Sequence, residues 1–288
     1  YTEAELNYML EAKHIEHFYR NFQNHPNIKI PKPYLNLSTR RIVVMEKIEG
    51  IPILDIRRDP KYDKRLINNI LTDSIMKQVF IDGYFHADPH PGNIFVLGKD
   101  RIAFLDFGIV GIIDEKLKEN ITKLFIGMIQ GNLDIMAEAL VNLDIVDQDT
   151  SLSMLKKDLY EAFAEYHNAA IQRYDMSDIF HKFIALAKKH NITLSKDFIL
   201  LGKTMITLQG VSKELDPGYN IVAAAKPFVE QLARQKLSPK ELWKKVKRGS
   251  MHLATFIQDF PEKTSLLLRW RKKADENLQA IDKDIRAM

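Results

Sequence analysis

The sequence of 288 residues contains no cysteine, which excludes disulfide bonds and every zinc or redox centre that depends on a thiolate. A chain without cysteine fits a reducing compartment. The sequence also has no signal-peptide pattern and no apolar run approaching the ~18 residues that a membrane span needs. We therefore expect a soluble polypeptide. Its hydrophobic content of 45% is enough for a sizeable core, in one large domain or in two lobes.

The most informative segment runs from Tyr84 to Asn93, with the sequence YFHADPHPGN, and it is followed by Asp106-Phe107-Gly108. In kinase-type sites, phosphoryl transfer uses a catalytic-loop aspartate, a loop asparagine and a metal-binding aspartate at fixed spacing. Asp88, Asn93 and Asp106 have this spacing. The sequence therefore predicts a kinase-like catalytic lobe, with these residues as its catalytic groups.

Two short apolar runs separate Asn93 from Asp106 and predict a β-hairpin. They are Ile94–Leu97 and Ile102–Leu105, joined by the turn-forming segment Gly98-Lys99-Asp100. In an antiparallel hairpin, the residue before the first strand and the residue after the second lie at the same end. We therefore expect Asn93 and Asp106 to face one site. An amide and a carboxylate oxygen there would bind Mg²⁺ together with phosphates and water.

The loop that carries Asp88 is expected to follow a defined, irregular path. Its two prolines fix two φ angles and exclude a helix, while Gly92 permits a positive φ angle. A zinc pair of His86 and His90 is disfavoured, because i, i+4 ligands require a helix. Asp88 would then accept a proton from a hydroxyl group or orient the phosphoryl acceptor. The alternative for these polar residues is a solvated surface turn.

The string HADPHPGN followed by LDFG resembles the UbiB (AarF-domain) family of atypical kinases, also called the ubiquinone-biosynthesis protein kinase-like family. Ordinary protein kinases carry an H-R-D loop and a later A-P-E segment, and neither is present. After Gly108 the chain passes directly to an apolar run and a helical pattern, which leaves little room for an activation loop. The resemblance covers roughly residues 1–235. It includes the segments Glu5–Tyr8, Glu11-Ala12, Leu208–Gly210 and Leu215–Pro217.

The resemblance implies an α/β (α+β) fold of the protein kinase-like type, with most of the N-lobe missing. A helix-rich C-lobe and a helical C-terminal extension would follow. We expect residues 1–46 to be the remnant of the N-lobe, with one helix and two strands. Residues 47–235 would form the C-lobe with the catalytic loop, and residues 236–288 a basic helical segment. The chain begins at Tyr1 within a helical pattern and without methionine, so we expect a fragment of a longer protein.

Apolar spacing gives the expected elements in more detail. Residues 3–22 and 62–82 show amphipathic helical spacing, and the runs Tyr34–Leu37 and Arg41–Met45, joined by Ser38–Arg40, are strand-like. Punctuation by Gly, Asp and Pro predicts further helices near 114–130, 132–143, 151–169, 176–190, 196–214 and 220–236. Their apolar faces predict a core of Phe125, Met128, Ile135, Leu140, Phe163, Phe180, Phe183, Leu186, Phe198, Leu201, Met205 and Leu208.

The resemblance also suggests residues that would bind the nucleotide. Met45-Glu46-Lys47 would form the hinge between the lobes where an adenine ring is recognised. The alternative for Glu46 is an ordinary charge at a strand end. Glu11 is the candidate for the helix glutamate that pairs with a strand lysine in kinase-like folds, the alternative being a surface glutamate. That lysine and a Gly- or Ala-rich loop before Glu11 are not in this sequence, so we expect residues 1–288 alone to have negligible ATPase activity. Glu5 matches the family's E-x-D element, but Asn7 replaces its aspartate.

Positive charge is concentrated near the C-terminus. Residues 231–273 contain twelve lysines and arginines against three acids, a net charge of +9, whereas the whole chain carries +4. Both tryptophans, Trp243 and Trp270, lie in this stretch. Basic residues beside interfacial aromatics suit an anionic membrane surface. A solvated helix face is the alternative, and no recognised nucleic-acid-binding module accompanies the charge.

These observations together predict an atypical kinase or ATPase of the UbiB type. The resemblance implies ATP and Mg²⁺ as cofactors and a role in isoprenoid quinone (ubiquinone) biosynthesis. We expect a peripheral protein on the cytoplasmic side of a membrane, with anionic or isoprenoid lipid and quinone-biosynthesis proteins as partners and no nucleic acid. Aminoglycoside or choline phosphotransferases share the H-x-D-x-x-x-x-N logic, but Ala87, Pro89 and the short route from Gly108 to the helices favour UbiB. A non-catalytic nucleotide- or lipid-binding scaffold is a further alternative.

Overall fold

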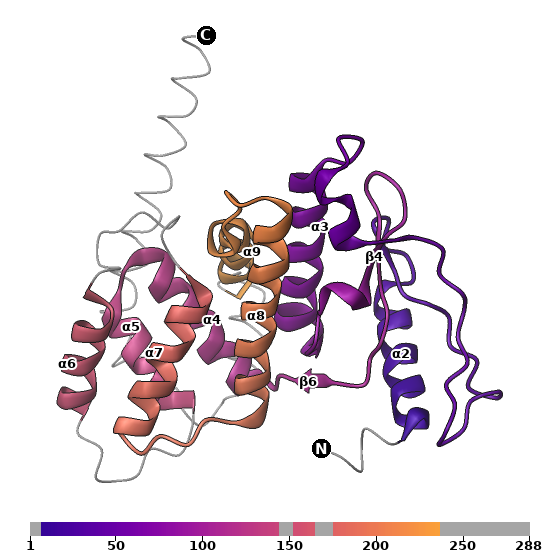
Figure 1. The fold of residues 1–288 in the computed structure, drawn as a ribbon. Helices are drawn as coiled ribbons and strands as arrows, with labels where there is room; N and C mark the ends of the chain where they lie inside the picture. Colours follow the sequence, from indigo (N-terminus) through magenta and orange to yellow (C-terminus); the bar gives the residue numbers. More distant parts are fainter. Residues whose placement is uncertain (1–6, 144–151, 165–174, 237–288) are drawn as a thin grey trace. The chain divides into compact units, whose positions relative to one another are not determined.

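The computed structural model describes residues 7–143, 152–164 and 175–236 (Figure 1). The contacts divide the chain into two units, Tyr1–Leu232 and Ala233–Met288. The first unit has a mixed α/β fold that is mostly helical, with two small sheets among the described residues. Glu5 and the part of the predicted basic segment beyond Lys236 lie outside the described residues. The expected boundaries at residues 46/47 and 235/236 stay predictions.

The first helix, α2, spans Tyr8–Phe22 and lies within the predicted range of 3–22. Its buried residues recur with helical spacing, which directs one face of the helix into the core. These residues are Ala12, Ile15, Phe18 and Phe22. The ring of Phe18 packs against the ring of Phe107, with the centroids 4.7 Å apart. Helix α2 is therefore fixed directly against the predicted Asp-Phe-Gly motif.

The predicted hairpin is confirmed as strands β4 and β5 of a four-stranded sheet with the order β1-β5-β4-β2. Strands β4 and β5 are antiparallel, and Ile94 lies opposite Phe104. Strand β1 runs parallel to β5, and β2 runs antiparallel to β4. A second sheet pairs β3 with β6. The bounds are Ile28–Lys29 for β1, Ile51–Pro52 for β2, Tyr84–His86 for β3, Ile94–Val96 for β4, Ile102–Phe104 for β5 and Val110–Ile112 for β6.

The strands predicted at Tyr34–Leu37 and Arg41–Met45 are wrong. Residues 34–45 form an irregular hairpin whose strand-like contacts are two isolated bridges, Pro33 to Met45 and Thr39 to Ile42. The cause is Ser38, whose buried hydroxyl donates to the Tyr34 carbonyl and accepts the N–H of Val44. A serine side chain that takes over backbone hydrogen bonds competes with a regular strand ladder. The segment therefore turns where the sequence pattern predicts extension.

Helix α3 spans Lys64–Lys77, begins at the N-cap Asp63 and continues as a π-helical turn, η2, over Gln78–Asp82. Together they match the helix predicted over 62–82. Gly83 ends the turn with a φ of 65°, and a Cβ there would lie 2.8 Å from the Ile113 carbonyl oxygen. A residue other than glycine would be both strained and crowded at this position. The turn leads directly into β3 and the loop predicted to be catalytic, and π-turns are frequent beside functional sites.

The predicted helical region is confirmed, and five of its six helices end within one residue of the expected positions. The helix predicted over 151–169 is shorter than expected, because α6 ends at Ala162 and a turn follows at Phe163. Side-chain oxygens of Asp114, Asp175 and Ser195 accept backbone N–H groups at the starts of α4, α7 and α8. The predicted core residues of this region are buried except Ile135 and Phe180, which are half-buried. No helix in the described ranges has the length and apolar character to cross a membrane. The helices are α4 Glu115–Gln130, α5 Leu133–Leu143, α6 Leu152–Ala162, α7 Met176–Lys189, α8 Lys196–Leu215 and α9 Ile221–Lys236.

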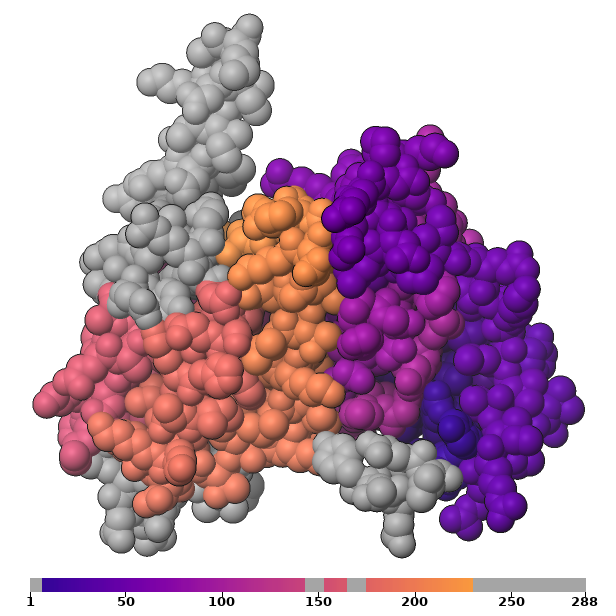
Figure 2. All heavy atoms as spheres, viewed as in Figure 1, coloured from indigo at the N-terminus to yellow at the C-terminus, as the bar shows by residue number. Residues whose placement is uncertain are grey.

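Helix α8 lies between α3 on one side and α7 on the other (Figure 1). Figure 2 shows that part of α8 also reaches the surface on this face of the molecule. The buried Asn68 side chain of α3 donates a hydrogen bond of 3.0 Å to the Ser212 carbonyl of α8. On its other side α8 packs so tightly that a Cβ at Gly202 would lie 1.9 Å from the Phe180 ring. The position of α8 is therefore closely fixed.

Candidate active site

The β4–β5 hairpin brings Asn93 and Asp106 to one place, as the sequence predicts. The N–H of Leu105 donates to the Asn93 carbonyl at 2.8 Å, which continues the hairpin pairing one step beyond the strands. Asp106 follows immediately and is exposed. An amide and a carboxylate at the same end of a hairpin suit a hard cation such as Mg²⁺. Their role as metal ligands stays a prediction.

Asp106 has an unusual backbone conformation with a φ of 52°. Among the described residues, the only other non-glycine residue with a positive φ is Asn191. Such conformations cost about 1 kcal/mol or more and are concentrated at functional sites. The turn sends the next side chain, Phe107, into the core with no exposed surface while the Asp106 carboxylate faces solvent. Asp106 Oδ1 also accepts the Gly108 N–H at 3.0 Å, which stabilises this turn.

The loop between Asp88 and Asn93 is held by its own hydrogen bonds, from the His90 N–H to the Asp88 backbone carbonyl at 2.7 Å and from the Asn93 N–H to the His90 carbonyl at 2.8 Å. The prediction that prolines exclude a helix applies only to an α-helix, because Pro91–Asn93 forms one 3₁₀ turn, η3. Pro91 occupies the first position of this turn, where a missing N–H has no cost. Gly92 is not among the described glycines with a positive φ. Within the described ranges no three His, Cys, Asp or Glu side chains cluster so that they could hold a metal ion.

His86, two residues before Asp88, is a buried support for the loop. The ring Nδ1 of His86 accepts the backbone N–H of Asp88 at 3.2 Å. The backbone N–H of His86 donates to Oε1 of the Gln78 side chain at 2.9 Å. Complete burial lowers the pKa of His86 to about 4, although the carboxylates of Asp106 and Asp88 oppose this shift. The ring is therefore neutral near pH 7. Through Gln78, the π-helical turn fixes the start of the loop that carries Asp88.

Glu11 of α2 contacts the Asp106-Phe107-Gly108 segment, while its pairing with a lysine stays a prediction. Its Oε1 accepts the Phe107 N–H at 3.3 Å. Burial raises the pKa of Glu11, and the nearby Asp106 carboxylate adds to this shift, while the hydrogen bond from Phe107 opposes it. His14, three residues further along α2, contacts the Phe107 carbonyl through Nδ1 at 2.8 Å. One face of α2 thus holds both polar groups of Phe107, and the sequence alone gave no signal for His14.

A lysine that the sequence pattern does not single out completes the site. Lys203 of α8 forms an ion pair with the half-buried Asp88, with Nζ 3.1 Å from Oδ1. Asn93 Nδ2 approaches the Asp88 carbonyl at 3.5 Å from the other side of the loop. Lys203 and Asp88 are far apart in the sequence and belong to different elements. No local pattern could have joined them.

The predicted hinge, Met45-Glu46-Lys47, is held by contacts with an earlier segment of the same polypeptide. Glu46 pairs with Lys29 at 2.7 Å, and its carboxylate also accepts the Lys32 N–H at 3.1 Å. Burial alone would raise the pKa of Glu46, but these hydrogen bonds outweigh it and lower the pKa. Met45 packs against the core and Lys47 is exposed. The role of these residues in binding adenine stays a prediction.

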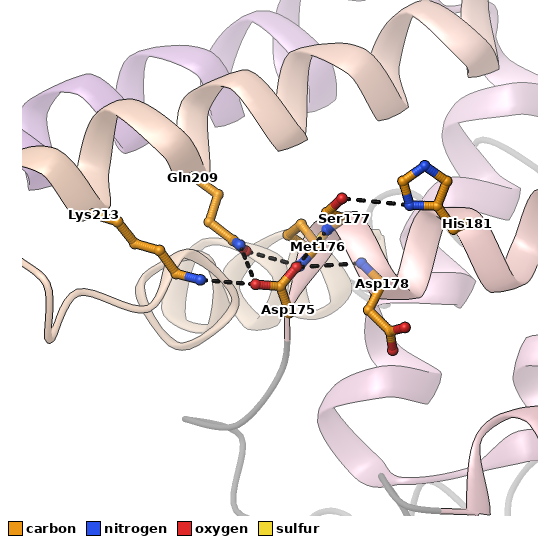
Figure 3. A network of polar contacts seen from close by, with 7 residues as sticks. All are labelled: Asp175, Met176, Ser177, Asp178, His181, Gln209 and Lys213. Carbon is orange, nitrogen blue, oxygen red and sulfur yellow. Dashed lines mark hydrogen bonds and ion pairs between the residues drawn. The ribbon is translucent and has the colours of Figure 1, made fainter.

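The Leu208-Gln209-Gly210 segment has a structural role in the helical region (Figure 3). The Gln209 side chain accepts the Met176 N–H and donates to Asp175, both at 2.8 Å. Lys213 pairs with the same Asp175 carboxylate at 2.8 Å. Asp175 also accepts two backbone N–H groups of the first turn of α7. This network joins the start of α7 to α8.

Comparison with known proteins gives consistent results. A family model described as an ABC1 atypical kinase-like domain matches residues 2–140, and one described as a UbiB helical domain matches residues 159–220. The chain is 26% identical over 287 residues to the probable protein kinase UbiB of Histophilus somni (strain 129Pt), covering 98% of this chain and 53% of that protein. It is 30% identical to the Arabidopsis thaliana protein ACTIVITY OF BC1 COMPLEX KINASE 1, chloroplastic, covering 78% and 33%. The chain thus spans about half or less of these relatives.

A solved structure shows a related fold. It is the complex of Rv3197 from Mycobacterium tuberculosis with erythromycin, with a TM-score of 0.51 and 20% sequence identity. The match covers 78% of this chain and 58% of that chain. At this level of identity the likeness concerns the fold alone.

Proposed function

The chain belongs to the UbiB/ABC1 family of atypical kinase-like proteins, and from this premise we propose that it binds ATP with Mg²⁺ and transfers or hydrolyses the terminal phosphoryl group. Membership of a kinase-like family implies nucleotide binding in general. In our proposal Asn93 and Asp106 hold Mg²⁺, and Asp88 accepts a proton or orients the acceptor. Glu11 anchors the Phe107 segment beside them. Met45-Glu46-Lys47 would contact adenine.

One observation carries this proposal, the hydrogen bond from Leu105 to Asn93 that closes the hairpin at the site. It pairs the backbones of Asn93 and Leu105, so Asn93 and the adjacent Asp106 stand at the same end of the hairpin before any cation binds. Mg²⁺ is usually held by few protein groups together with substrate phosphates, which matches this small donor set. The strained backbone of Asp106 supports the same assignment.

The membrane and quinone parts of the proposal rest on the family and on sequence. We propose that residues 1–46 are the remainder of an N-lobe. We also propose that the +9 stretch between residues 231 and 273 attaches the protein to anionic lipid, in support of isoprenoid quinone biosynthesis. Co-sedimentation with vesicles is expected to rise with anionic lipid content and to fall with salt. Equal binding to neutral and anionic vesicles would contradict the attachment.

The test of the metal site is Asp106→Asn in the full-length protein, with Asp100→Asn as the matched control. Asp100 is an exposed aspartate in the turn of the same hairpin. Asparagine tolerates the left-handed backbone of Asp106, so the fold is expected to be kept while one charged ligand is lost. Calorimetric titration with Mg·ATP should show an affinity lower by roughly 100-fold for Asp106→Asn and unchanged for Asp100→Asn. Equal affinities in the two variants would refute the assignment.

A further inference from the structure

The polar groups at the candidate site are predominantly acidic. Asp88, Asp106 and Glu11 contribute carboxylates, and the loop from Asp88 to Asn93 contains no lysine or arginine. In the part of the chain that the structure describes, the one cation in an ion pair with these carboxylates is Lys203, 3.1 Å from Asp88. ATP adds further negative charge to such a site, and phosphoryl transfer depends on cations that neutralise it.

The fold holds the backbone of Lys203 in place from two directions. Before Lys203 in α8, Asp197 Oδ1 accepts the N–H of Ile112 in β6 at 3.0 Å. After it, the Ser212 carbonyl accepts the Asn68 side chain of α3 at 3.0 Å. The Lys203 side chain itself is 51% exposed. A fixed backbone with a half-exposed, flexible side chain allows the ammonium group to change partners without movement of the helix.

We infer that Lys203 binds the terminal phosphoryl group of ATP, an inference that rests on the proposed function. In transfer, the attacking oxygen, the phosphorus and the leaving oxygen are roughly in line, so the group that orients the acceptor lies next to the phosphoryl group. Asp88 is that group in our proposal, and Lys203 lies beside it. Without nucleotide, Lys203 balances the charge of Asp88. With nucleotide, it contacts the terminal phosphate and leaves the Asp88 carboxylate to the acceptor.

The hydroxyl oxygen of the acceptor, or of water in ATP hydrolysis, forms a bond to the γ-phosphorus. The bond between this phosphorus and the β–γ bridging oxygen breaks, and its electron pair remains on ADP. The acceptor proton passes to Asp88. Lys203 transfers no proton, and its positive charge stabilises the equatorial oxygens of the transferring group.

The test compares Lys203→Met and Lys203→Arg with the control Lys213→Met in the full-length protein. Lys213 lies on the same helix, and its pair with Asp175 has side-chain exposures of 49% and 38%, close to 51% and 34% for Lys203 and Asp88. Lys203→Met is expected to lower kcat by roughly 100-fold and to weaken Mg·ATP binding about tenfold more than Mg·ADP binding. Lys203→Arg should restore most of both losses, because it keeps the charge. Lys213→Met should change neither kcat nor the preference for ATP.

The outcomes separate this inference from the proposed function. If the wild-type protein binds neither Mg·ATP nor Mg·ADP in calorimetric titration, the proposed function fails and the inference fails with it. If the wild-type protein binds Mg·ATP while Lys203→Met keeps the same kcat and preference for ATP, the inference alone fails. A lower melting temperature with unchanged preference also overturns it, because a purely structural ion pair behaves in that way. Lys203→Gln provides a second neutral variant for the same titration if the Met variant does not fold.

Discussion

Two aspartates pair with lysines of the same helix, yet their surroundings differ. Asp175 accepts hydrogen bonds from Gln209, from Lys213 and from two backbone N–H groups of α7. The carboxylate of Asp88 has one partner in the described part of the chain, Lys203. A carboxylate has about four acceptor positions. Those of Asp175 are occupied by the protein, whereas those of Asp88 are largely open to a ligand.

The difference separates a structural charge from one suited to chemistry. Burial alone would raise the pKa of Asp175, but the hydrogen bonds from Lys213 and the N–H groups of α7 outweigh it and lower the pKa. A carboxylate held in this way is stabilised in its charged form and in one orientation. Asp88 retains freedom to exchange its partner, which a proton acceptor requires. Substitutions at the two aspartates should therefore affect different properties, turnover for Asp88 and stability for Asp175.

The largest expected effect is on turnover, from Asp88→Asn in the full-length protein. Loss of a general base or acceptor-orienting group lowers kcat by roughly 10²- to 10⁴-fold, with little change in ATP affinity. Asp175→Ala should leave kcat per folded molecule nearly unchanged. Steady-state ATPase assays combined with calorimetric titration measure both quantities. Equal turnover in the Asp88 variant and the wild type would remove the proposed distinction.

A second expected effect concerns the stability of the fold in acid. The contributions of His86 and Asp175 to the free energy of unfolding should be lost in different pH ranges. The folded pKa of His86, about 4, lies below its ordinary value of 6.5, so between these values the unfolded chain binds a proton that the folded chain does not. The contribution of His86 to the free energy of unfolding is therefore fully present above pH 6.5. It is lost as the pH is lowered toward 4, by roughly 3 kcal/mol in total. The folded pKa of Asp175 is also lowered, but from 3.8, so its contribution is lost only at lower pH.

His86→Asn provides the measurement for this window, because an amide oxygen can still accept the Asp88 N–H but does not titrate. Melting temperatures of wild type and variant should be compared from pH 7.5 to pH 4.5 without nucleotide or metal. The melting temperature of the wild type is expected to fall more steeply with decreasing pH than that of the variant, so the difference between the two melting temperatures should narrow or reverse. A constant difference over this range would show that burial of His86 does not control acid stability.

The smallest expected effect is on stability, from Asp175→Ala. The substitution removes the N-cap of α7 and leaves the Gln209 amide without its partner, at a cost of about 1–2 kcal/mol. Glu214→Ala is a matched control on α8, because its pair with Arg57 is exposed and such pairs contribute little. Chemical unfolding of both variants measures the difference. A loss for Glu214→Ala as large as that for Asp175→Ala would contradict the special role of the α7 cap.

Some features of the fold and of the site could be predicted from the sequence, and others could not. The hairpin and the helices follow from local patterns, including apolar spacing and capping residues such as Asp114 and Ser195. The regular strands predicted near Ser38 were wrong, because the Ser38 hydroxyl bonds the Tyr34 carbonyl and the Val44 N–H and so competes with a regular strand ladder there. Lys203 and His14 could not be found, because their contacts with the site join distant segments and leave no periodic signal. A single sequence predicts local interactions, but it does not predict which distant residues contact each other in the fold.

The left-handed backbone of Asp106 has a consequence for how this site could change over evolutionary time. Of the ordinary residues, glycine, asparagine and aspartate adopt such a conformation most readily. Replacement by another residue would therefore strain the turn that sends Phe107 into the core, besides removing the carboxylate. We expect a descendant that abandons catalysis but keeps its fold to carry asparagine or glycine at this position. The backbone thus restricts the routes by which this site can become a pseudoenzyme.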